Sequence, residues 1–173
     1  MSEFFFRRAE GDHQEDIPVR ELQFKGLRMR IPVCLEEMPV QRQETHYPYQ
    51  EKPDLILFEK EKAVEMTFQF MKDAGQDTDA IAVIGAIRRY VEERFDLQKL
   101  YPVRFLKLGD EYISWFLTEL FLGEKVVKHR KYVMFSGKDM YHFTLTYPPE
   151  EETKWGNIMN WVLFSIEVEH EKN

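Results

Sequence analysis

The chain has 173 residues, of which 43% are hydrophobic and 14% aromatic, and this apolar content excludes an intrinsically disordered protein. Its length fits one domain, which can bury roughly 70% of the surface that the unfolded chain exposes. With 31 acidic and 24 basic residues the net charge is −7, which disfavours nonspecific binding to nucleic acid. We therefore expect one globular domain without a nucleic-acid partner.

Residues 1–16 include the polar stretch AEGDHQED and predict a flexible N-terminal arm, in which Phe4–Phe6 could still form an edge strand. Residues 17–173 then form the single domain. The three phenylalanines are not a secretory signal, because a signal places basic residues before an apolar run of about 7–15 residues. No segment approaches the roughly 18 apolar residues of a membrane span. We expect a cytoplasmic protein.

The first half of the chain predicts two hairpins and a helix. Residues 21–32, ELQFKGLRMRIP, alternate around Lys25-Gly26 as in a short hairpin or bulged strand. Residues 36–54 contain three prolines and lack periodicity, which predicts a long loop of the kind that is often functional. Cys34 has no second cysteine with which to form a disulfide, and we expect it to be at least half-buried.

Beyond this loop, residues 54–59 and 63–71 form a predicted hairpin with Val64, Met66, Phe68 and Phe70 on one face. The period then changes to that of a helix that begins at an Asp77 or Thr78 cap and continues to Phe95. Its apolar stripe comprises Ala80, Ile84, Ile87, Val91 and Phe95.

The second half returns to strands, in VRFLKL, EYISWFLTELFL, KVVKHRKYVMF and MYHFTLTY. A symmetrical turn at residues 136–139 pairs Met134 with Tyr141, Tyr132 with Phe143 and Arg130 with Leu145. This register makes one face of the hairpin mostly apolar. The opposite face is polar and is expected to meet water; it carries His129, Lys131, His142, Thr144 and Thr146.

The last strand ends at Pro148-Pro149, and three glutamates then supply the negative charge that favours a helix start. The helix that follows has Trp155, Ile158, Met159, Val162 and Ile166 on one stripe. We expect an α+β fold, in which an antiparallel sheet of about six or seven strands has two main helices packed on one face. Its core should include Phe68, Ile84, Ile87, Trp115, Phe143, Trp155 and Val162.

This order of elements resembles the PsbP-like fold, which is shared by the PsbP proteins, the Ran-binding Mog proteins and the DcrB group. Two segments carry the resemblance: IPVCLEEMP, a strand that enters a Pro-containing loop, and FTLTYPPEEETKWGNIMNWVLFSIEV, a strand, an acidic linker and a closing helix. It covers residues 20–168 in element order.

The resemblance implies a binding role, since members of this fold mostly bind other proteins and some DcrB relatives are adaptor chaperones for secreted bacterial effectors. It implies no catalytic constellation, so no site residue is carried over. Two departures weaken any transfer of function: the chain shows no export signal, and no residue pattern matches a Ran-binding site.

Motifs for catalysis, metal or cofactor binding are not evident. The five histidines follow neither HxH nor HExxH spacing, and the eight glycines form no phosphate-binding loop. Carboxylate clusters such as residues 150–152 are explained by a helix start. We therefore predict no metal and no cofactor, and whether the chain is an enzyme stays open.

Two surface features are candidates for binding a protein partner. The segment KVVKHRK is basic in an acidic protein and contributes Lys128, Arg130 and Lys131 as candidate contacts. On the expected register Lys128 and Arg130 lie on the otherwise apolar face, so they must reach the sheet edge or be paired. Trp161 and Phe164 fall outside the main stripe of the last helix and are candidate aromatic contacts. A solvated strand and a wide buried helix face are the alternatives.

Two classes of function remain. The first is a non-catalytic protein-interaction module, an adaptor or chaperone-like protein of bacterial type. The second is a small-molecule-binding protein or enzyme with a cleft between sheet and helix. An open apolar groove without converging acids and histidines would favour the first class, whereas a closed pocket lined by perturbed titratable groups would favour the second.

Overall fold

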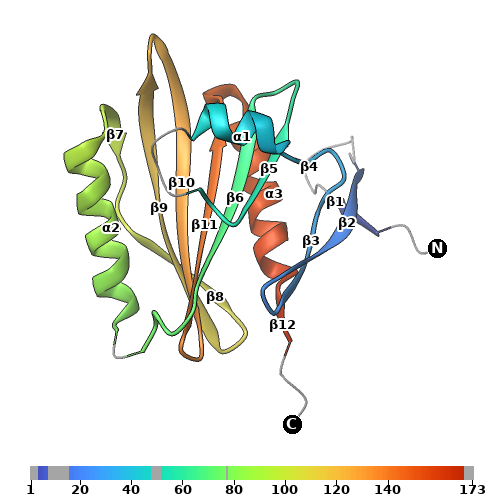
Figure 1. The fold of residues 1–173 in the computed structure, drawn as a ribbon, viewed down its shortest axis with the longest axis vertical. Coiled ribbons are helices and arrows are strands. Elements are labelled where there is room, and N and C mark those ends of the chain that lie inside the picture. Colours follow the sequence, from blue (N-terminus) through green and yellow to red (C-terminus); the bar gives the residue numbers. More distant parts are fainter. Residues whose placement is uncertain (1–3, 8–15, 48–51, 77, 170–173) are drawn as a thin grey trace.

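The computed structural model describes residues 4–7, 16–47, 52–76 and 78–169, and for residues 4–7 it describes only the backbone. Within these ranges the strands form two antiparallel sheets, which are joined by helices into an α+β fold (Figure 1). The antiparallel α+β class expected from the sequence is confirmed.

The larger sheet, called the main sheet below, contains eight strands among the described residues, in the order β4-β5-β6-β11-β10-β9-β7, and β8 also pairs with β9. Their bounds are β4 (Glu36–Glu37), β5 (Leu55–Glu59), β6 (Val64–Met71), β7 (Leu97–Leu100), β8 (Arg104–Leu108), β9 (Glu111–Leu122), β10 (Lys125–Ser136) and β11 (Asp139–Tyr147). The predicted register of β10 and β11 is confirmed, with Tyr132 opposite Phe143.

A smaller N-terminal sheet has the order β1-β2-β3-β12 in the described part of the chain. It comprises β1 (Phe4–Arg7), β2 (Asp16–Phe24), β3 (Leu27–Pro32) and β12 (Glu167–Val168). The turn between β2 and β3 places Lys25 and Gly26 at positive φ, 46° and 82°, so the hairpin interpretation of this segment is confirmed. Phe4–Arg7 pairs with β2, while residues 8–15 of the predicted arm lie outside the described residues.

The two main helices lie on opposite sides of the main sheet, so the expectation that both cover one face is wrong. In Figure 1 the main sheet stands between α2 (Ala80–Arg94) on the left and α3 (Glu152–Phe164), with the N-terminal sheet, on the right. A short 3₁₀ turn, Pro149–Glu151, leads into α3. Among the described residues, no helix is long and apolar enough to cross a membrane.

The main core fills the space between the main sheet, α3 and the N-terminal sheet. Phe68, Phe143, Trp155 and Val162 are buried there, and Trp115 packs against them from β9. A second core lies under α2, where Ile84 and Val91 meet Phe116, Val133 and Met140 of the sheet, with Ile87 partly buried beside them. Each side of the sheet therefore has its own apolar layer, because a helix covers each side.

The long loop predicted over residues 36–54 is partly ordered, so that prediction is wrong in part. It contains β4 and the helix α1 (Val40–His46), which lies on the same side of the sheet as α2. The helix has no buried residue and no side-chain cap, so it lacks the periodicity by which a helix is recognised in a sequence. Cys34 is exposed, contrary to expectation, and lies in the turn that follows β3.

Candidate functional site

The basic segment of β10 is divided between the two faces of the main sheet. Lys128 and Arg130 face α3, because Arg130 is opposite Leu145 of the apolar side, and the residues between and after them face α1 and α2. The segment thus contributes to two separate environments, one of them an ion-pair network and the other a cleft.

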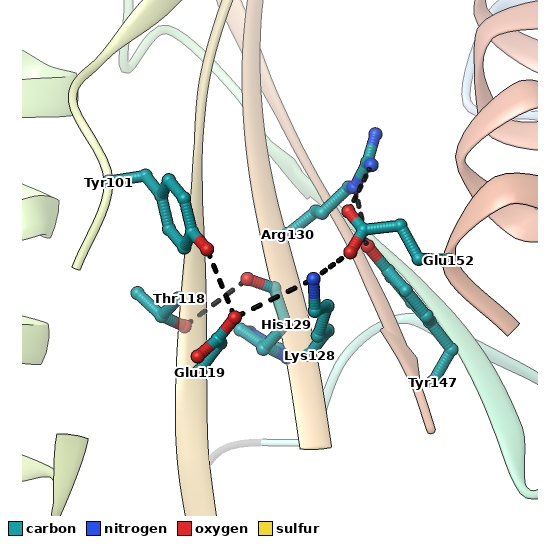
Figure 2. Close-up of polar contacts among 8 residues, drawn as sticks. All are labelled: Tyr101, Thr118, Glu119, Lys128, His129, Arg130, Tyr147 and Glu152. Carbon is teal, nitrogen blue, oxygen red and sulfur yellow. Dashed lines mark hydrogen bonds and ion pairs between the residues drawn. The ribbon is translucent and has the colours of Figure 1, made fainter. Parts of the chain in front are cut away.

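The ion-pair network connects three elements across the α3 side (Figure 2). Lys128 Nζ contacts Glu119 Oε1 on β9 at 3.6 Å and also binds Glu152 at the start of α3. Arg130 Nη2 donates to Glu152 Oε1 at 3.2 Å, and its Nε donates to the hydroxyl oxygen of Tyr147 at 2.8 Å. Glu152 therefore anchors the first turn of α3 to both cations of the sheet.

Arg130 is also held by aromatic rings and by the close approach of α3. Its guanidinium carbon lies 5.1 Å from the ring centre of Trp115 and 5.7 Å from that of Tyr147. A Cβ atom built on Gly156 would lie 2.8 Å from Arg130 Nη2, so a larger residue there would require the guanidinium to shift. These contacts fix the cation, which otherwise would be costly to bury.

Because of the ion-pair network, the two basic side chains on the α3 side are largely withdrawn from solvent. The side chains of Lys128 and Arg130 are 15% and 10% exposed, and Glu119 and Glu152 balance their charges. On α3, Trp161 is partly buried against the main core, whereas Phe164 is 60% exposed. The structure thus brings Lys128 and Arg130 together but places Lys131, Trp161 and Phe164 elsewhere.

The opposite face of the main sheet forms the floor of a cleft between α1 and α2. This polar cleft has a volume of about 270 Å³. Val91 and Phe95, at the C-terminal end of α2, form one wall, and Tyr47 and Pro53 form the other. The floor carries the polar side chains of β6, β10 and β11 together with Leu120 of β9; those polar residues are Thr67, Gln69, His129, Lys131, His142 and Thr144.

Burial shifts the titratable groups of the polar cleft toward their neutral forms. It lowers the pKa of the Lys131 ammonium from 10.5 to about 8. Burial, with Lys131 as a nearby like charge, also lowers the pKa of His142 from 6.5 to about 3. The pKa of His129 falls well below its ordinary value for the same reasons. Perturbed groups of this kind, gathered in a cleft, are typical of functional sites.

Hydrogen bonds arrange the floor but leave some of its groups without a partner. Thr67 and Thr144 share a hydrogen bond, and His129 Nδ1 lies 2.7 Å from Thr146 Oγ1. In the described part of the chain, His142 Nε2 is buried without a hydrogen-bond partner, and no hydrogen bond or ion pair reaches Lys131. The floor therefore contains polar groups that the described residues do not satisfy.

A second hollow, called the apolar groove below, adjoins the polar cleft. The two share Tyr47, Leu120, His129 and Thr144, and the groove has a volume of about 450 Å³. It lies between α1 with the β5–β6 turn and the β9–β10 hairpin, which projects past the other strands at the top of Figure 1. Its apolar lining comes from both walls: Met38, Tyr47, Phe58, Ala63, Val64, Leu120, Leu122 and Val127.

The sequence placed the right residues on this face but predicted the wrong surroundings. His129, Lys131, His142, Thr144 and Thr146 were expected to meet water, whereas Thr144 is buried and the others are half-buried. The sequence could not show that α1 covers the face beside β5. The signal that was available is the set of polar residues at alternate positions on three strands, which pair as neighbours.

Metal binding finds no support among the described residues, where no three His, Cys, Asp or Glu side chains are grouped to hold an ion. No family model matches the chain, and a comparison with curated protein sequences also finds no match.

Solved structures do resemble it. Cyanobacterial PsbP (CyanoP) from Synechocystis sp. PCC 6803 aligns with a TM-score of 0.66 and 10% identity over 87% of this chain and 92% of its own. LpqN, which is involved in cell envelope biogenesis of Mycobacterium tuberculosis, aligns with a TM-score of 0.56 and 10% identity over 98% and 93%. PA94 of Pseudomonas aeruginosa, a protein of unknown function, gives 0.52 and 8% identity over 97% and 99%. The chain therefore has the PsbP-like fold, as the resemblance in its sequence implies.

Proposed function

We propose that the protein is a non-catalytic interaction module, adaptor-like or chaperone-like, that holds a segment of a partner polypeptide in the apolar groove. We propose it as a cytoplasmic protein of bacterial type. The observation that carries the proposal is the groove itself, whose apolar side chains come from two separate walls. The PsbP-like fold supports a binding role, because its members mostly bind other proteins. No catalytic constellation is visible among the described residues.

The groove suits a polypeptide segment because of its shape and its rim. Leu122, at the tip of the projecting hairpin, is 59% exposed and faces the groove, so its apolar surface is available to a partner. Arg42, Lys60 and Lys125 line the groove together with Glu59 and Glu65, which gives it an apolar centre with charged groups of both signs. Interfaces commonly combine an apolar centre with a polar rim.

The five partner contacts expected from the sequence have different positions relative to the groove, and so have different roles in this proposal. Phe164 and Trp161 on α3 are proposed as a second contact, separate from the groove. Lys131 belongs to the polar cleft that adjoins the groove. Lys128 and Arg130 act on a partner only through the ion-pair network that positions β10.

The experiment that tests the groove is site-directed photo-crosslinking in cells. Benzoylphenylalanine replaces Leu122 in the groove or, as a matched control, Tyr112, which is exposed at the other end of β9. The proposal expects crosslinks from position 122 to a discrete polypeptide, and loss of those crosslinks when Phe58→Asp is added. Crosslinks of equal yield from both positions, or none from position 122, would contradict it.

A further inference from the structure

The polar floor of the cleft differs from the neighbouring part of the same face of the main sheet, which is apolar. Under α2 the face is apolar, with Phe116, Val133 and Met140 packed against Ile84 and Val91. Only a few residues away along the same strands, the lining changes to lysine, histidine and threonine. A sheet face flanked by two helices is normally apolar, because burying polar side chains costs free energy unless each is paired.

Among the described residues, the cleft lining has one cation, Lys131, and no acidic side chain to balance its charge. His129 and His142 lie beside it as neutral groups, since burial lowers the pKa of both. Glu65, which lies on the neighbouring groove, is already engaged: one oxygen accepts from Tyr47 and the other lies 3.1 Å from His46 Nε2. By contrast, Lys128 and Arg130, on the other face of β10, each form an ion pair with Glu152. A half-buried ammonium without a carboxylate favours an anion as its partner.

We propose that the polar cleft binds a small organic monocarboxylate, whose charged group is held by Lys131 and whose apolar part lies against Val91, Phe95 and Leu120. The volume of about 270 Å³ suits a small molecule, and the described lining combines one cation, several neutral polar groups and several apolar side chains. His142 lines the same floor and has a buried Nε2 atom without a hydrogen-bond partner among the described residues.

The surroundings favour a single negative charge over the two charges of a phosphate. The apolar wall belongs to the C-terminal end of α2, where the helix dipole is negative. The described residues of the lining include one lysine and no arginine, so they offer no bidentate fork to hold a phosphate group. One carboxylate matches one ammonium.

Carboxylate binding should also take up a proton at mildly alkaline pH. Burial lowers the pKa of Lys131 to about 8, and a bound carboxylate would raise it again. The other titratable groups of the lining do not titrate there: the pKa values of His129 and His142 are lowered, and that of Tyr47 is raised by burial and by its bond to Glu65. The remaining residues from α2 and β6 are uncharged.

The test titrates the full chain with phenylacetate, and separately with the neutral 2-phenylethanol and with phenyl phosphate, by calorimetry and by NMR. We expect saturable binding of phenylacetate that shifts the amide signals of Thr67 and Thr144, and weaker binding of the other two probes. Lys131→Met should weaken phenylacetate at least about tenfold, the order expected for loss of a charge pair. Lys107→Met, which removes an exposed lysine on β8, should leave it unchanged.

Calorimetry in two buffers of different ionisation enthalpy, at about pH 8.5, should show proton uptake by the wild type and none by Lys131→Met. Absence of saturable phenylacetate binding would overturn the proposal. Equal binding by Lys131→Met, in a variant shown to be folded by thermal unfolding, would also overturn it, as would preference for the alcohol or the phosphate. Leu122→Asp, in the groove, should not alter phenylacetate binding. Failure of the cleft proposal can therefore be distinguished from failure of the groove proposal, which the crosslinking experiment tests.

Discussion

Replacing Lys131 by methionine should stabilise the protein at neutral pH. The ammonium lies in the floor of the polar cleft without an anionic partner among the described residues, and burial lowers its pKa from 10.5 to about 8. One pKa unit corresponds to about 1.4 kcal/mol, so this shift corresponds to at most about 3 kcal/mol of unfavourable free energy in the folded state. Methionine is unbranched, is shorter than lysine by one atom and removes the charge. Because Lys131 is only half-buried and water can relax around it, we expect a gain of about 1–2 kcal/mol.

The pH dependence gives this prediction its sign. Between pH 8 and pH 10.5 the unfolded chain holds a proton on Lys131 that the folded chain has lost, so wild-type stability rises with pH in this window. The penalty is fully present below pH 8 and is gone above pH 10.5. The advantage of Lys131→Met should therefore be largest at neutral pH and should shrink through this window.

Urea denaturation followed by tryptophan fluorescence, at neutral pH and at about pH 10, measures both effects. Lys125→Met is the matched control, because it removes an exposed lysine from the start of the same strand and should change stability by less than about 0.5 kcal/mol. If Lys131→Met is less stable than the wild type at neutral pH, the ammonium has a partner and the reasoning is wrong. A gain that persists unchanged at high pH would refute the assigned cause.

Three further predictions concern the described contacts. Gly156→Ala should lower the free energy of unfolding by about 1 kcal/mol in urea denaturation, because crowding of Arg130 outweighs the better helix propensity of alanine; a more stable variant would contradict it. Wild-type stability should fall as pH drops below 6.5, since unfolded His142 then gains a proton that the folded side chain accepts only near pH 3. In an acid titration down to about pH 4, His142→Gln should lose up to about 3 kcal/mol less than the wild type, and equal acid sensitivity would count against this cause. Asp79→Ala should cost about 1 kcal/mol in thermal unfolding, because Asp79 Oδ1 accepts from Ile81 N at 3.0 Å at the start of α2, and an unchanged midpoint would remove this cap from the argument.

Local periodicity in the sequence predicted the strands and helices whose apolar residues face a core. The alternation in β6, β10 and β11 indicated both the strands and their register, because a shift of one residue would place Phe143 on the polar side. The stripe on α3 was equally informative, since Trp155, Met159 and Val162 are all buried. These elements are determined by their own residues.

The elements that the sequence missed depend on contacts far along the chain. Helix α1 has no buried residue, so nothing in its own sequence distinguishes it from a loop. The sequence also could not predict which side of the main sheet each helix covers. An amphipathic stripe shows that a helix packs on a sheet, but it does not show on which face. The polar cleft depends on both facts. Its floor residues could be assigned to one face, but their burial follows from α1 and α2.

The network around Arg130 shows the same limit at the level of one residue. The register predicted that Lys128 and Arg130 lie on the apolar side, so that at least one of them must reach past the sheet edge or be paired. It could not name Glu152 as the partner of both, because that depends on where α3 begins relative to β10. Gly156 carries no such signal in the sequence, since a glycine within a helix has several possible reasons.

The position of the N-terminal sheet determines from which side of the protein a label or an immobilising surface can be coupled. Strands β1 and β12, the two edges of that sheet, lead toward the two ends of the chain. Both belong to the α3 side of the main sheet, whereas the cleft and the groove open on the α1 and α2 side (Figure 1). A label or a surface coupled to β1 or β12 would therefore lie on the α3 side and leave the cleft and the groove free. Protein immobilised in this way should bind phenylacetate as the free protein is proposed to do.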